Sequence, residues 1–353
     1  MADAPVRLLL AGAGAIGRAH ARHVAASDAC VLAGVVDPAP VSRDWARQLG
    51  VPHADQLEPA LAAWRPDGVI LATPNTLHVV GALACLERGV PVLVEKPIAD
   101  RLHDALTLVE AAQRLRVPVL VGHHRRHSAA MATACETIAS GVLGRLVAVQ
   151  GSALFRKPQA YFDAAPWRRE SGGGPILINM IHEVDNLRLL AGEIAEVQAI
   201  ASNARRGHAV EDTVAIVLRF VGGALGTFLL SDAAASTHSW EQTSGENGMY
   251  ARDASEACYH VSGERGSLAI PTMRLQLATG DEASWLEPLH EQRLVVPTVD
   301  PLRRQLDHFI AVIQRREAPR VSAADAAATL AATLAIAESA ASGRPVRCDK
   351  IAL

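Results

Sequence analysis

The chain has 353 residues, half of them hydrophobic and a fifth charged, with a formal net charge of -3 at pH 7. This length predicts two domains, and a charge so near zero excludes a strong field for nucleic acid or an anionic membrane. The five cysteines are scattered singly with no CxxC pair, which excludes a disulfide framework and a cysteine-based zinc site. We expect a reduced, cytoplasmic protein that needs no metal.

The first residues run from a short polar lead into an apolar stretch that ends in glycines. They lack the basic start, the long apolar middle and the cleavage site of a secretory signal peptide. Even the Ala-rich stretch Ala323 to Ala341 carries Asp325 and Glu338 as well as several Ser and Thr residues. This stretch therefore predicts a helix of a folded domain rather than a membrane span.

Short apolar runs and helical patterns alternate in the first third of the chain. Strands are expected at 6–11, 31–36, 68–72, 92–94 and 117–121. Helices are expected at 15–26, 45–49, 78–88 and 105–115. This alternation predicts a doubly wound parallel sheet of the Rossmann type, covered on both faces, for a domain over residues 1–122.

The rhythm changes after Gly122. Long strand-like runs follow at 146–154, 197–201, 213–220 and 224–230. A helix is expected near 129–140, and 301–342 predicts two helices joined around Pro319, which can pack back on the first domain. Residues 123–353 are thus predicted to form an α+β domain with an open, mostly antiparallel sheet, helices on one side. Its other face, rich in Val, Ile and Leu from Val214 to Leu230, predicts a homodimer or a homotetramer.

A glycine-rich motif lies between the first predicted strand and the helix that follows it. Gly12, Gly14 and Gly17 form the pattern GxGxxG, with Ala15 and Ile16 inside it. Glycines at these positions let the backbone approach a pyrophosphate at the N-terminus of the helix. Because a strand precedes the motif and a helix follows it, the context predicts a dinucleotide site rather than an ordinary tight turn.

Asp37 ends the second strand, where a carboxylate is expected to bind the ribose 2′-hydroxyl of the cofactor. A carboxylate there repels a 2′-phosphate, so NAD is the predicted cofactor and NADP the alternative. Two observations keep the alternative open: Asp37 also begins an Asp-Pro turn with Pro38, and Arg43 lies close enough in sequence to meet a phosphate.

Several short motifs follow one another in order. They are GAGAIG at 12–17, ATPN with His78 at 72–78, VEKP at 94–97, VGHHRRH at 121–127, Trp167-Arg168, and GGGPILINMIHEVD at 172–185. With these motifs the chain resembles the Gfo/Idh/MocA family of oxidoreductases over essentially its whole length. Several motifs in the right order are far more specific than any one of them.

The resemblance implies a role for each matching residue around the cofactor. Thr73, Pro74, Asn75 and His78 line the nicotinamide side of the cleft, Glu95 and Lys96 lie beside the ring, and Pro97 fixes the turn, commonly as a cis peptide. A lysine at the carboxyl end of a parallel strand lies in the crevice where ligands bind and can donate to the reacting oxygen there. We therefore predict Lys96 as a catalytic residue.

A second catalytic group is expected after the turn Gly172–Gly174. A helix over 176–190 would place Ile178, His182 and Asp185 on one face. The family often has an Asp four residues before the His, forming a carboxylate–imidazole pair that relays the proton, and this chain has Ile178 at that position. The resemblance therefore implies a dyad that lacks its acid.

We predict His182 as the acid/base group that orients the substrate. Asn179 can hydrogen-bond a substrate hydroxyl but accepts no proton, and Asp185 is the other predicted substrate ligand on this segment. Asp185 or Glu183 would have to orient the imidazole. The order of importance of Lys96 and His182 stays open.

Two irregular segments, 155–174 and 236–256, carry large polar and aromatic side chains, as loops that line a site often do. We predict Tyr161, Trp167 and Arg168 as substrate ligands, because an aromatic face can stack on a ring and a guanidinium can hold a carboxylate or a cofactor phosphate. Packing within the loop is the alternative.

Two further groups are weaker candidates. Trp240 and Glu241 are expected to border the substrate pocket or a subunit interface. In the basic cluster 123–127, neighbouring positions at a strand end point opposite ways, so the side chains cannot all converge on a metal or an anion. We expect His124, as a substrate ligand, and Arg125 to face the cleft.

These residues predict an NAD(H)-dependent oxidoreductase that moves a hydride between nicotinamide and a carbinol or carbonyl carbon of a small polar molecule. The resemblance implies a sugar, a sugar acid or a cyclic polyol as substrate, and a cyclic dihydrodiol as the second choice. Two other classes stay open: an NAD-sensing regulator without turnover, and a glycosidase that uses NAD transiently. Retention of both Lys96 and His182 argues against the regulator.

Overall fold

The computed structural model describes residues 4–280 and 283–348 and divides them into two compact units. The first contains the chain up to His124 together with Pro301–Leu330, and the second contains Arg125–Asp300 together with the chain from Ala331 on. The sequence predicts a single domain boundary, after residue 122, whereas the structure assigns residues 301–330 to the first unit. Each unit has its own sheet.

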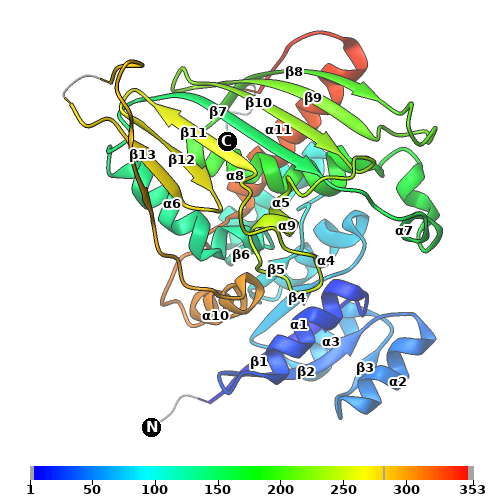
Figure 1. Cartoon of the computed structure of the whole chain (residues 1–353). Coiled ribbons are helices and arrows are strands. Elements are labelled where there is room, and N and C mark those ends of the chain that lie inside the picture. The colour runs from blue at the N-terminus through cyan, green and yellow to red at the C-terminus, as the bar shows by residue number, and fades with distance from the viewer. Residues whose placement is uncertain (1–3, 281–282, 349–353) are drawn as a thin grey trace. The chain divides into compact units, whose positions relative to one another are not determined.

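The first unit is built on a six-stranded sheet in the order β3-β2-β1-β4-β5-β6 (Figure 1). The strands are β1 (Val6–Ala11), β2 (Cys30–Val36), β3 (His53–Ala54), β4 (Gly68–Leu71), β5 (Val92–Val94) and β6 (Val119–Val121). All neighbouring strands run parallel. The order reverses between β1 and β4, which is the switch point where α/β sheets bind ligands. The predicted Rossmann sheet is confirmed.

Helices connect these strands. The connecting helices are α1 (Ala15–Ala25), α2 (Pro40–Gln48), α3 (Leu57–Trp64), α4 (His78–Leu86) and α5 (Leu102–Leu115). A later helix, α10 (Pro301–Ile313), belongs to the same unit and packs against α1. The central strands are buried on both faces, which explains why they read as continuous apolar runs. The sequence analysis missed β3 and α3. It also began α2 too late, although Pro40 at its first turn is a common helix start.

The second unit is built on a nine-stranded sheet in the order β14-β13-β12-β11-β7-β10-β9-β8-β15. Its long strands are β7 (Leu146–Leu154), β8 (Ile194–Ser202), β9 (Thr213–Phe220) and β10 (Leu225–Ser231). Its shorter strands are β11 (Tyr259–Gly263), β12 (Gly266–Ile270), β13 (Arg274–Leu277), β14 (His290–Arg293) and β15 (Val346–Arg347). Neighbours are antiparallel except β7 and β10, which run parallel. The mostly antiparallel sheet is confirmed, but β11 to β14 were not predicted.

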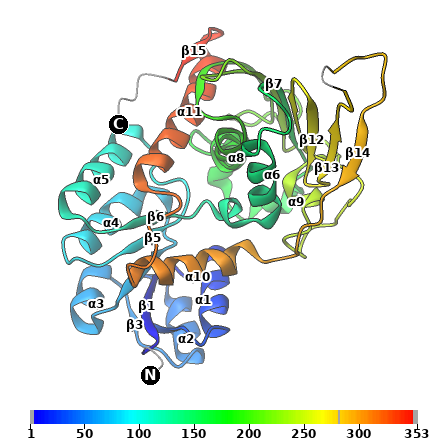
Figure 2. The ribbon, with the colours of Figure 1, turned by 90° about the vertical axis from the view of Figure 1, so that its left-hand side faces the viewer.

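Helices cover one face of this sheet. They are α6 (Ala129–Ala139), α8 (Ile181–Ala191), α9 (Trp240–Thr243) and α11 (Ala323–Ser342), whose second half belongs to this unit. The short helix α7 (Gln159–Asp163) lies beyond the strand ends in Figure 1. Figure 2 shows α6 beside α8, which it contacts. Val184 and Leu187 of α8 belong to one buried core with Ile216 and Phe228 of the sheet. Along β9 and β10 these buried residues alternate with exposed residues, whose side chains point to the other face of the sheet.

One expected helix differs from the structure. Residues Ile176–Met180 form a π-helix, and the α-helix begins only at Ile181. A π segment widens the turn, so the spacing of an α-helix does not hold across it. The expectation that 176–190 form one α-helix is therefore wrong at its start. The two helices around Pro319, α10 and α11, are confirmed.

Within residues 4–280 and 283–348, no helix is both long and apolar enough to cross a membrane.

Candidate functional site

The backbone around β1 requires two of the three motif glycines. Gly12 has φ +98°, and a Cβ there would lie 2.3 Å from the carbonyl oxygen of Ala72. A Cβ on Gly17 would lie 2.0 Å from the carbonyl oxygen of Gly12. Both distances are below any that real Cβ atoms show, so the first turn of α1 packs against the ends of β1 and β4 only with glycines.

Gly14 faces a different environment. It precedes α1 in extended conformation, no side chain caps the helix, and a Cβ there would have no heavy atom within 4 Å. The N-terminus of α1 therefore presents its unsatisfied backbone N–H groups to open space. A pyrophosphate fits this place, because it accepts such hydrogen bonds and is attracted by the positive end of the helix dipole. Ala15 and Ile16 form the first turn there.

Asp37 is fixed at the end of β2 by the backbone on both sides. Its Oδ2 accepts a hydrogen bond from the N–H of Ala13 at 2.7 Å, and its Oδ1 accepts one from Ala39 at 2.8 Å. A carboxylate has further lone pairs, so the half-buried side chain can also accept from ribose hydroxyls. Arg43 is exposed and lies 3.4 Å from Asp55, not from Asp37.

The loops after β4 and β5 are joined by a buried histidine. Nδ1 of His78 lies 2.7 Å from the carbonyl oxygen of Pro97, and Nε2 lies 2.9 Å from that of Thr73. Burial lowers the pKa of His78, against the raising effect of its contacts with the two carbonyl groups. His78 thus holds the two loops together.

The neighbouring side chains of this loop are less constrained. The side-chain hydroxyl of Thr73 is buried and has no hydrogen-bond partner among the described residues. Pro74 precedes a 3₁₀ turn at Asn75–Leu77, and the amide oxygen of Asn75 accepts from the N–H of Thr76. A buried hydroxyl without a partner is costly, so Thr73 is suited to a bound ligand.

Glu95 forms a buried ion pair that the sequence analysis missed. Its Oε1 lies 2.8 Å from Nε2 of His20, a residue of α1, and both side chains are nearly inaccessible. Burial alone would raise the pKa of Glu95, but the hydrogen bond and charge of His20, with the charges of Lys96 and His124, outweigh it and lower the pKa. Glu95 is therefore an ionised carboxylate close to Lys96.

The peptide bond between Lys96 and Pro97 is cis, as the family resemblance implies. Lys96 is half-buried at the carboxyl end of β5. Gly122, at the end of the adjacent β6, leaves room for the Glu95 carboxylate, which would lie 3.0 Å from a Cβ there. The ends of the neighbouring strands β5 and β6 thus determine where Glu95 and Lys96 lie.

In the second unit, His182 lies in the first turn of α8 and is 8% exposed. Asn179 precedes it in the π-helix, and its Oδ1 accepts a hydrogen bond from Nζ of Lys157 at 2.6 Å. The sequence analysis did not name Lys157. The available signal was the dipeptide Lys157-Pro158, which repeats Lys96-Pro97.

Asp185 is buried, and both of its oxygens accept from the guanidinium of Arg126 at 2.8 Å. This bidentate pair ties α8 to the 3₁₀ turn His124–His127. Asp185 remains a predicted substrate ligand, although the structure shows it engaged within the unit. His124 is half-buried, and its charge acts on Glu95.

Arg125 does not face a cleft as expected. It is 3% exposed and donates to Glu183 and to Glu241, each at 2.7 Å. Burial and the Glu241 charge raise the pKa of Glu183 against the lowering effect of Arg125. Tyr259 donates a hydrogen bond to Glu183. The charges of Arg125 and Glu183 are tolerated in the interior of the unit because the two groups form an ion pair.

Trp240 also differs from expectation. It is 3% exposed, its indole N–H donates to Glu246 at 2.9 Å, and Arg125 lies 5.7 Å from its ring. Trp240 therefore belongs to the interior of the second unit rather than to a pocket rim, whereas Glu241 is partly buried and paired with Arg125. His123 and His127 are buried as well, and no group of three metal-ligating side chains occurs in the part of the chain that the structure describes.

The segment before the glycine turn gathers the remaining candidates. Arg168 lies 3.8 Å from the ring centre of Tyr161 and donates to the carbonyl oxygen of Tyr161 at 2.5 Å. Trp167 is 53% exposed. Gly174 has φ +79° and lies against Glu211, which accepts from the N–H of Ile176 at 2.8 Å. The glycine turn thus fixes where the π-helix begins.

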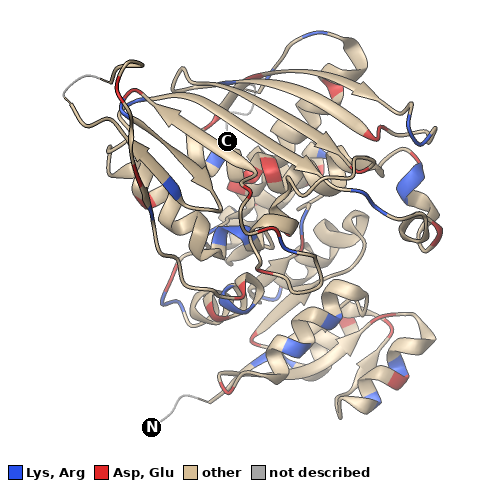
Figure 3. Cartoon of the chain, viewed as in Figure 1, with Lys and Arg blue, Asp and Glu red and all other residues tan. Residues whose placement is uncertain are grey.

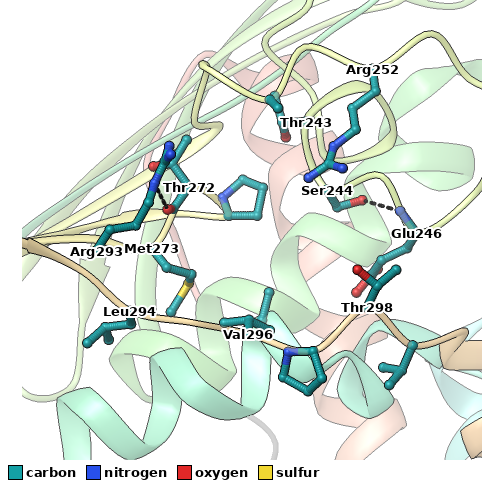
Figure 4. A pocket seen from close by; sticks show the side chains of 15 residues that line it. Thr243, Ser244, Glu246, Arg252, Thr272, Met273, Arg293, Leu294, Val296 and Thr298 are labelled. Carbon is teal, nitrogen blue, oxygen red and sulfur yellow. Dashed lines mark hydrogen bonds between the residues drawn. The ribbon is translucent and has the colours of Figure 1, made fainter.

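A separate cavity of about 220 Å³ lies elsewhere in the second unit (Figure 4). The segment 236–256 contributes Thr243, Ser244, Glu246 and Arg252 to its wall, as a loop that lines a cavity. Arg293 on the other side donates to the carbonyl oxygen of Thr272 at 3.1 Å. The substrate ligands predicted from the sequence do not line it.

A glycine loop that cradles a helix N-terminus, an acidic residue at the end of β2 and a second unit with an open sheet define a dinucleotide-binding oxidoreductase. Residues 6–123 match the model of an oxidoreductase family with an NAD-binding Rossmann fold, and residues 131–269 match the GFO/IDH/MocA C-terminal domain. The chain belongs to the Gfo/Idh/MocA family.

Several relatives share most of the chain. A 1,5-anhydro-D-fructose reductase of Ensifer adhaerens is 30% identical over 80% of both chains, and an inositol 2-dehydrogenase of Rhizobium meliloti is 26% identical over 97% of this chain and 98% of its own. The match to the rhizopine catabolism protein MocA of Rhizobium meliloti, 32% identical, spans 53% of this chain and 57% of that protein.

Among solved structures, the WlbA dehydrogenase of Bordetella pertussis, in complex with NADH and UDP-GlcNAcA, has a TM-score of 0.78. It is 25% identical and is matched over 97% of this chain and 98% of its own. The chain therefore has the NAD-binding fold of this family.

Proposed function

We propose that this protein is an NAD(H)-dependent dehydrogenase or reductase acting on a carbinol or carbonyl carbon of a sugar, sugar acid or cyclic polyol. The observation that carries the proposal is the open place at Gly14, with Asp37 held beside it by the N–H of Ala13. The relatives support the substrate class, because they include a reductase of an anhydro sugar and an inositol dehydrogenase.

When bound, NAD supplies the hydride acceptor, and the protein supplies alignment and proton handling. We assign the proton of the reacting hydroxyl to Lys96, whose neutral amine can accept this proton during oxidation and whose ammonium form can donate it during reduction. The charge of Lys96 is among the causes that keep the neighbouring Glu95 carboxylate ionised. His182 is assigned as the second acid/base group, with Asn179 as a hydrogen-bonding partner of the substrate.

Turnover tests this proposal directly. Purified enzyme with NAD should form NADH on one class of a panel of sugars, sugar acids, inositols and cyclic dihydrodiols. Turnover of dihydrodiols alone would replace the proposed substrate class. Tight NADH binding without turnover on any member would contradict the enzyme assignment and favour a regulator.

Asp37→Ser is expected to shift the preference from NAD towards NADP. A hydrogen bond to a charged group is worth about 1.5–3 kcal/mol, so kcat/KM for NAD should fall about tenfold or more, while removal of the negative charge should improve NADP. Steady-state kinetics with both cofactors measure the ratio. Asp55→Ser, which removes a neighbouring exposed carboxylate, is the matched control. An unchanged ratio would refute the assignment of Asp37.

We also propose that the protein is a homodimer or homotetramer formed through the outer face of the sheet. Ile200, Ala215 and Leu229 are cross-strand neighbours on β8, β9 and β10, and all three are exposed. Figure 3 shows few charged residues along these strands. Exposed apolar rows of this kind mark interaction surfaces.

Leu229→Asp is expected to dissociate the assembly, because it places a charge in the centre of this face. Size-exclusion chromatography with light scattering should give a multiple of 37.3 kDa for the wild type and 37.3 kDa for the variant. Val41→Asp, at an exposed position of α2, is the control. A wild type that is monomeric at micromolar concentration would exclude the proposal.

A further inference from the structure

A cationic cluster surrounds Tyr161 in the second unit. Lys157 Nζ lies 4.7 Å from the centre of the Tyr161 ring, and the guanidinium carbon of Arg168 lies 3.8 Å from the same centre. Lys157 also contacts Asn179, the residue assigned to the substrate, at 2.6 Å. Figure 3 shows Lys and Arg in blue around α7, where this cluster lies. Two cations therefore share one aromatic ring next to a proposed substrate ligand.

The charge of Arg168 is not balanced within the unit. It makes no ion pair within 4 Å among the described residues, and its one hydrogen bond from the guanidinium goes to a neutral carbonyl, that of Tyr161. Its Nε is buried and lacks a hydrogen-bond partner. A buried donor without an acceptor is unfavourable, and an anion would satisfy both this N–H and the charge.

The acidic groups of the same region are occupied elsewhere. Asp232 lies 3.7 Å from Lys157, but its Oδ1 accepts from Arg206 at 2.7 Å. Asp212 accepts from the backbone N–H groups of Arg205 and Arg206. Asp232 and Asp212 therefore bind other groups, and among the described residues neither forms an ion pair with Arg168.

The choice of lysine at position 157 is itself informative. The chain has 34 Lys and Arg residues, and only Lys96, Lys157 and Lys350 are lysines. A chain that otherwise uses arginine places lysines at 96 and 157, in each case before a proline. Lysine offers a compact charge with three donors, which can bind Asn179 and a ligand oxygen at the same time.

We propose that Lys157 and Arg168 form an anion subsite, so that the substrate is an acidic sugar derivative carrying a carboxylate or a phosphate, rather than a neutral sugar, an inositol or a dihydrodiol. Tyr161 supports both cations with its ring, and Asn179 binds a hydroxyl beside the anion. This inference rests on the proposed function, because it names the substrate class of the same site.

Binding of matched acidic and neutral probes tests the subsite. Calorimetric titration of the NADH-loaded protein compares D-gluconate with sorbitol, D-glucuronate with D-glucose, and glucose 6-phosphate with D-glucose. In each comparison the acidic probe should bind more tightly than the neutral one. Preference for gluconate and glucuronate identifies a carboxylate, and preference for glucose 6-phosphate identifies a phosphate. Lys157→Met and Arg168→Met should each weaken acid binding about tenfold or more, because a charge-assisted hydrogen bond is lost, and should weaken neutral binding much less.

The controls separate charge from packing. Lys157→Arg should restore part of the acid preference because it keeps the charge. Arg156→Met removes a neighbouring exposed cation, which points the other way along the extended chain, and should change neither probe. Equal binding of acidic and neutral probes, or equal losses for both in Lys157→Met, would overturn the subsite.

The outcome also distinguishes this inference from the proposed function. Turnover of neutral members with no acid preference would refute the anion subsite and leave the dehydrogenase standing. Lys157-dependent binding of acids without turnover of any probe would support the subsite and count against the dehydrogenase.

Discussion

Lys96→Met is expected to lower kcat by about 10²–10⁴-fold, the contribution typical of a positioned acid/base group. The side chain keeps its length but loses the proton that we assign to the reacting oxygen. NADH affinity should change little, because the glycine loop and Asp37 hold the other end of the cofactor. Stopped-flow measurement of the hydride-transfer step, together with fluorescence titration of NADH, separates these effects.

Lys96→Arg is the matched control for this experiment. Arginine keeps the charge but does not lose its proton in proteins, so Lys96→Arg should retain cofactor binding without restoring turnover. If Lys96→Met retained wild-type kcat, the assignment of the lysine to proton transfer would be wrong. If both variants lost NADH binding, Lys96 would be a cofactor ligand rather than an acid/base group.

Arg125→Met is expected to lower the free energy of unfolding of the second unit by about 3–5 kcal/mol, as when one partner of a buried ion pair is removed. The variant leaves the buried carboxylate of Glu183 and the partly buried carboxylate of Glu241 without their shared cation. Urea denaturation followed by the fluorescence of Trp240, which lies beside Arg125, measures the loss. Arg145→Met, at an exposed ion pair with Glu264, should cost far less.

The destabilisation by Arg125→Met should depend on pH, in a direction that follows from the pKa of Glu183. The pKa of Glu183 is raised already in the wild type, first by burial, and loss of Arg125 removes a lowering influence. An acid with a raised pKa in the folded state disfavours folding as the pH rises through that pKa. The destabilisation by Arg125→Met should therefore be largest at neutral pH and shrink as the pH falls. A pH-independent loss would attribute the effect to packing alone.

The first unit could be predicted largely from the sequence because its signals are local. The apolar runs at β1, β2 and β4 are buried on both faces and read as continuous strands. The glycine motif carries its own constraint, since Gly12 and Gly17 admit no side chain. The two-residue β3 was missed because so short a strand has no period to read.

The second unit was less predictable because its sheet depends on distant pairing. β11 pairs with β7, more than 100 residues earlier, and the strands β13 and β14 at the sheet edge carry polar residues such as Gln276 and Glu291. The pairing of His20 with Glu95 and of Lys157 with Asn179 likewise joins segments far apart in the chain. The sequence motifs contain one residue of each pair, whereas the partner of that residue can be identified only from the fold.

Ile178 shows where resemblance and structure complement each other. Its position, where the family often has an Asp, lies within a π-helix that the sequence did not suggest. The polar group beside it is Asn179, bound to Lys157. An amide and a lysine joined by a hydrogen bond therefore occur next to the place where the family often has the acid of its dyad.

Label transfer tests the central claim most directly. A substrate identified from the panel, carrying deuterium on the reacting carbinol carbon, is incubated with the enzyme and NAD, and the cofactor is analysed by mass spectrometry. The account predicts one deuterium in each NADH formed, with an oxidised product in equal amount. Unlabelled cofactor, with the substrate unchanged or cleaved without net NADH, would contradict it and favour the regulator or the internal-redox glycosidase.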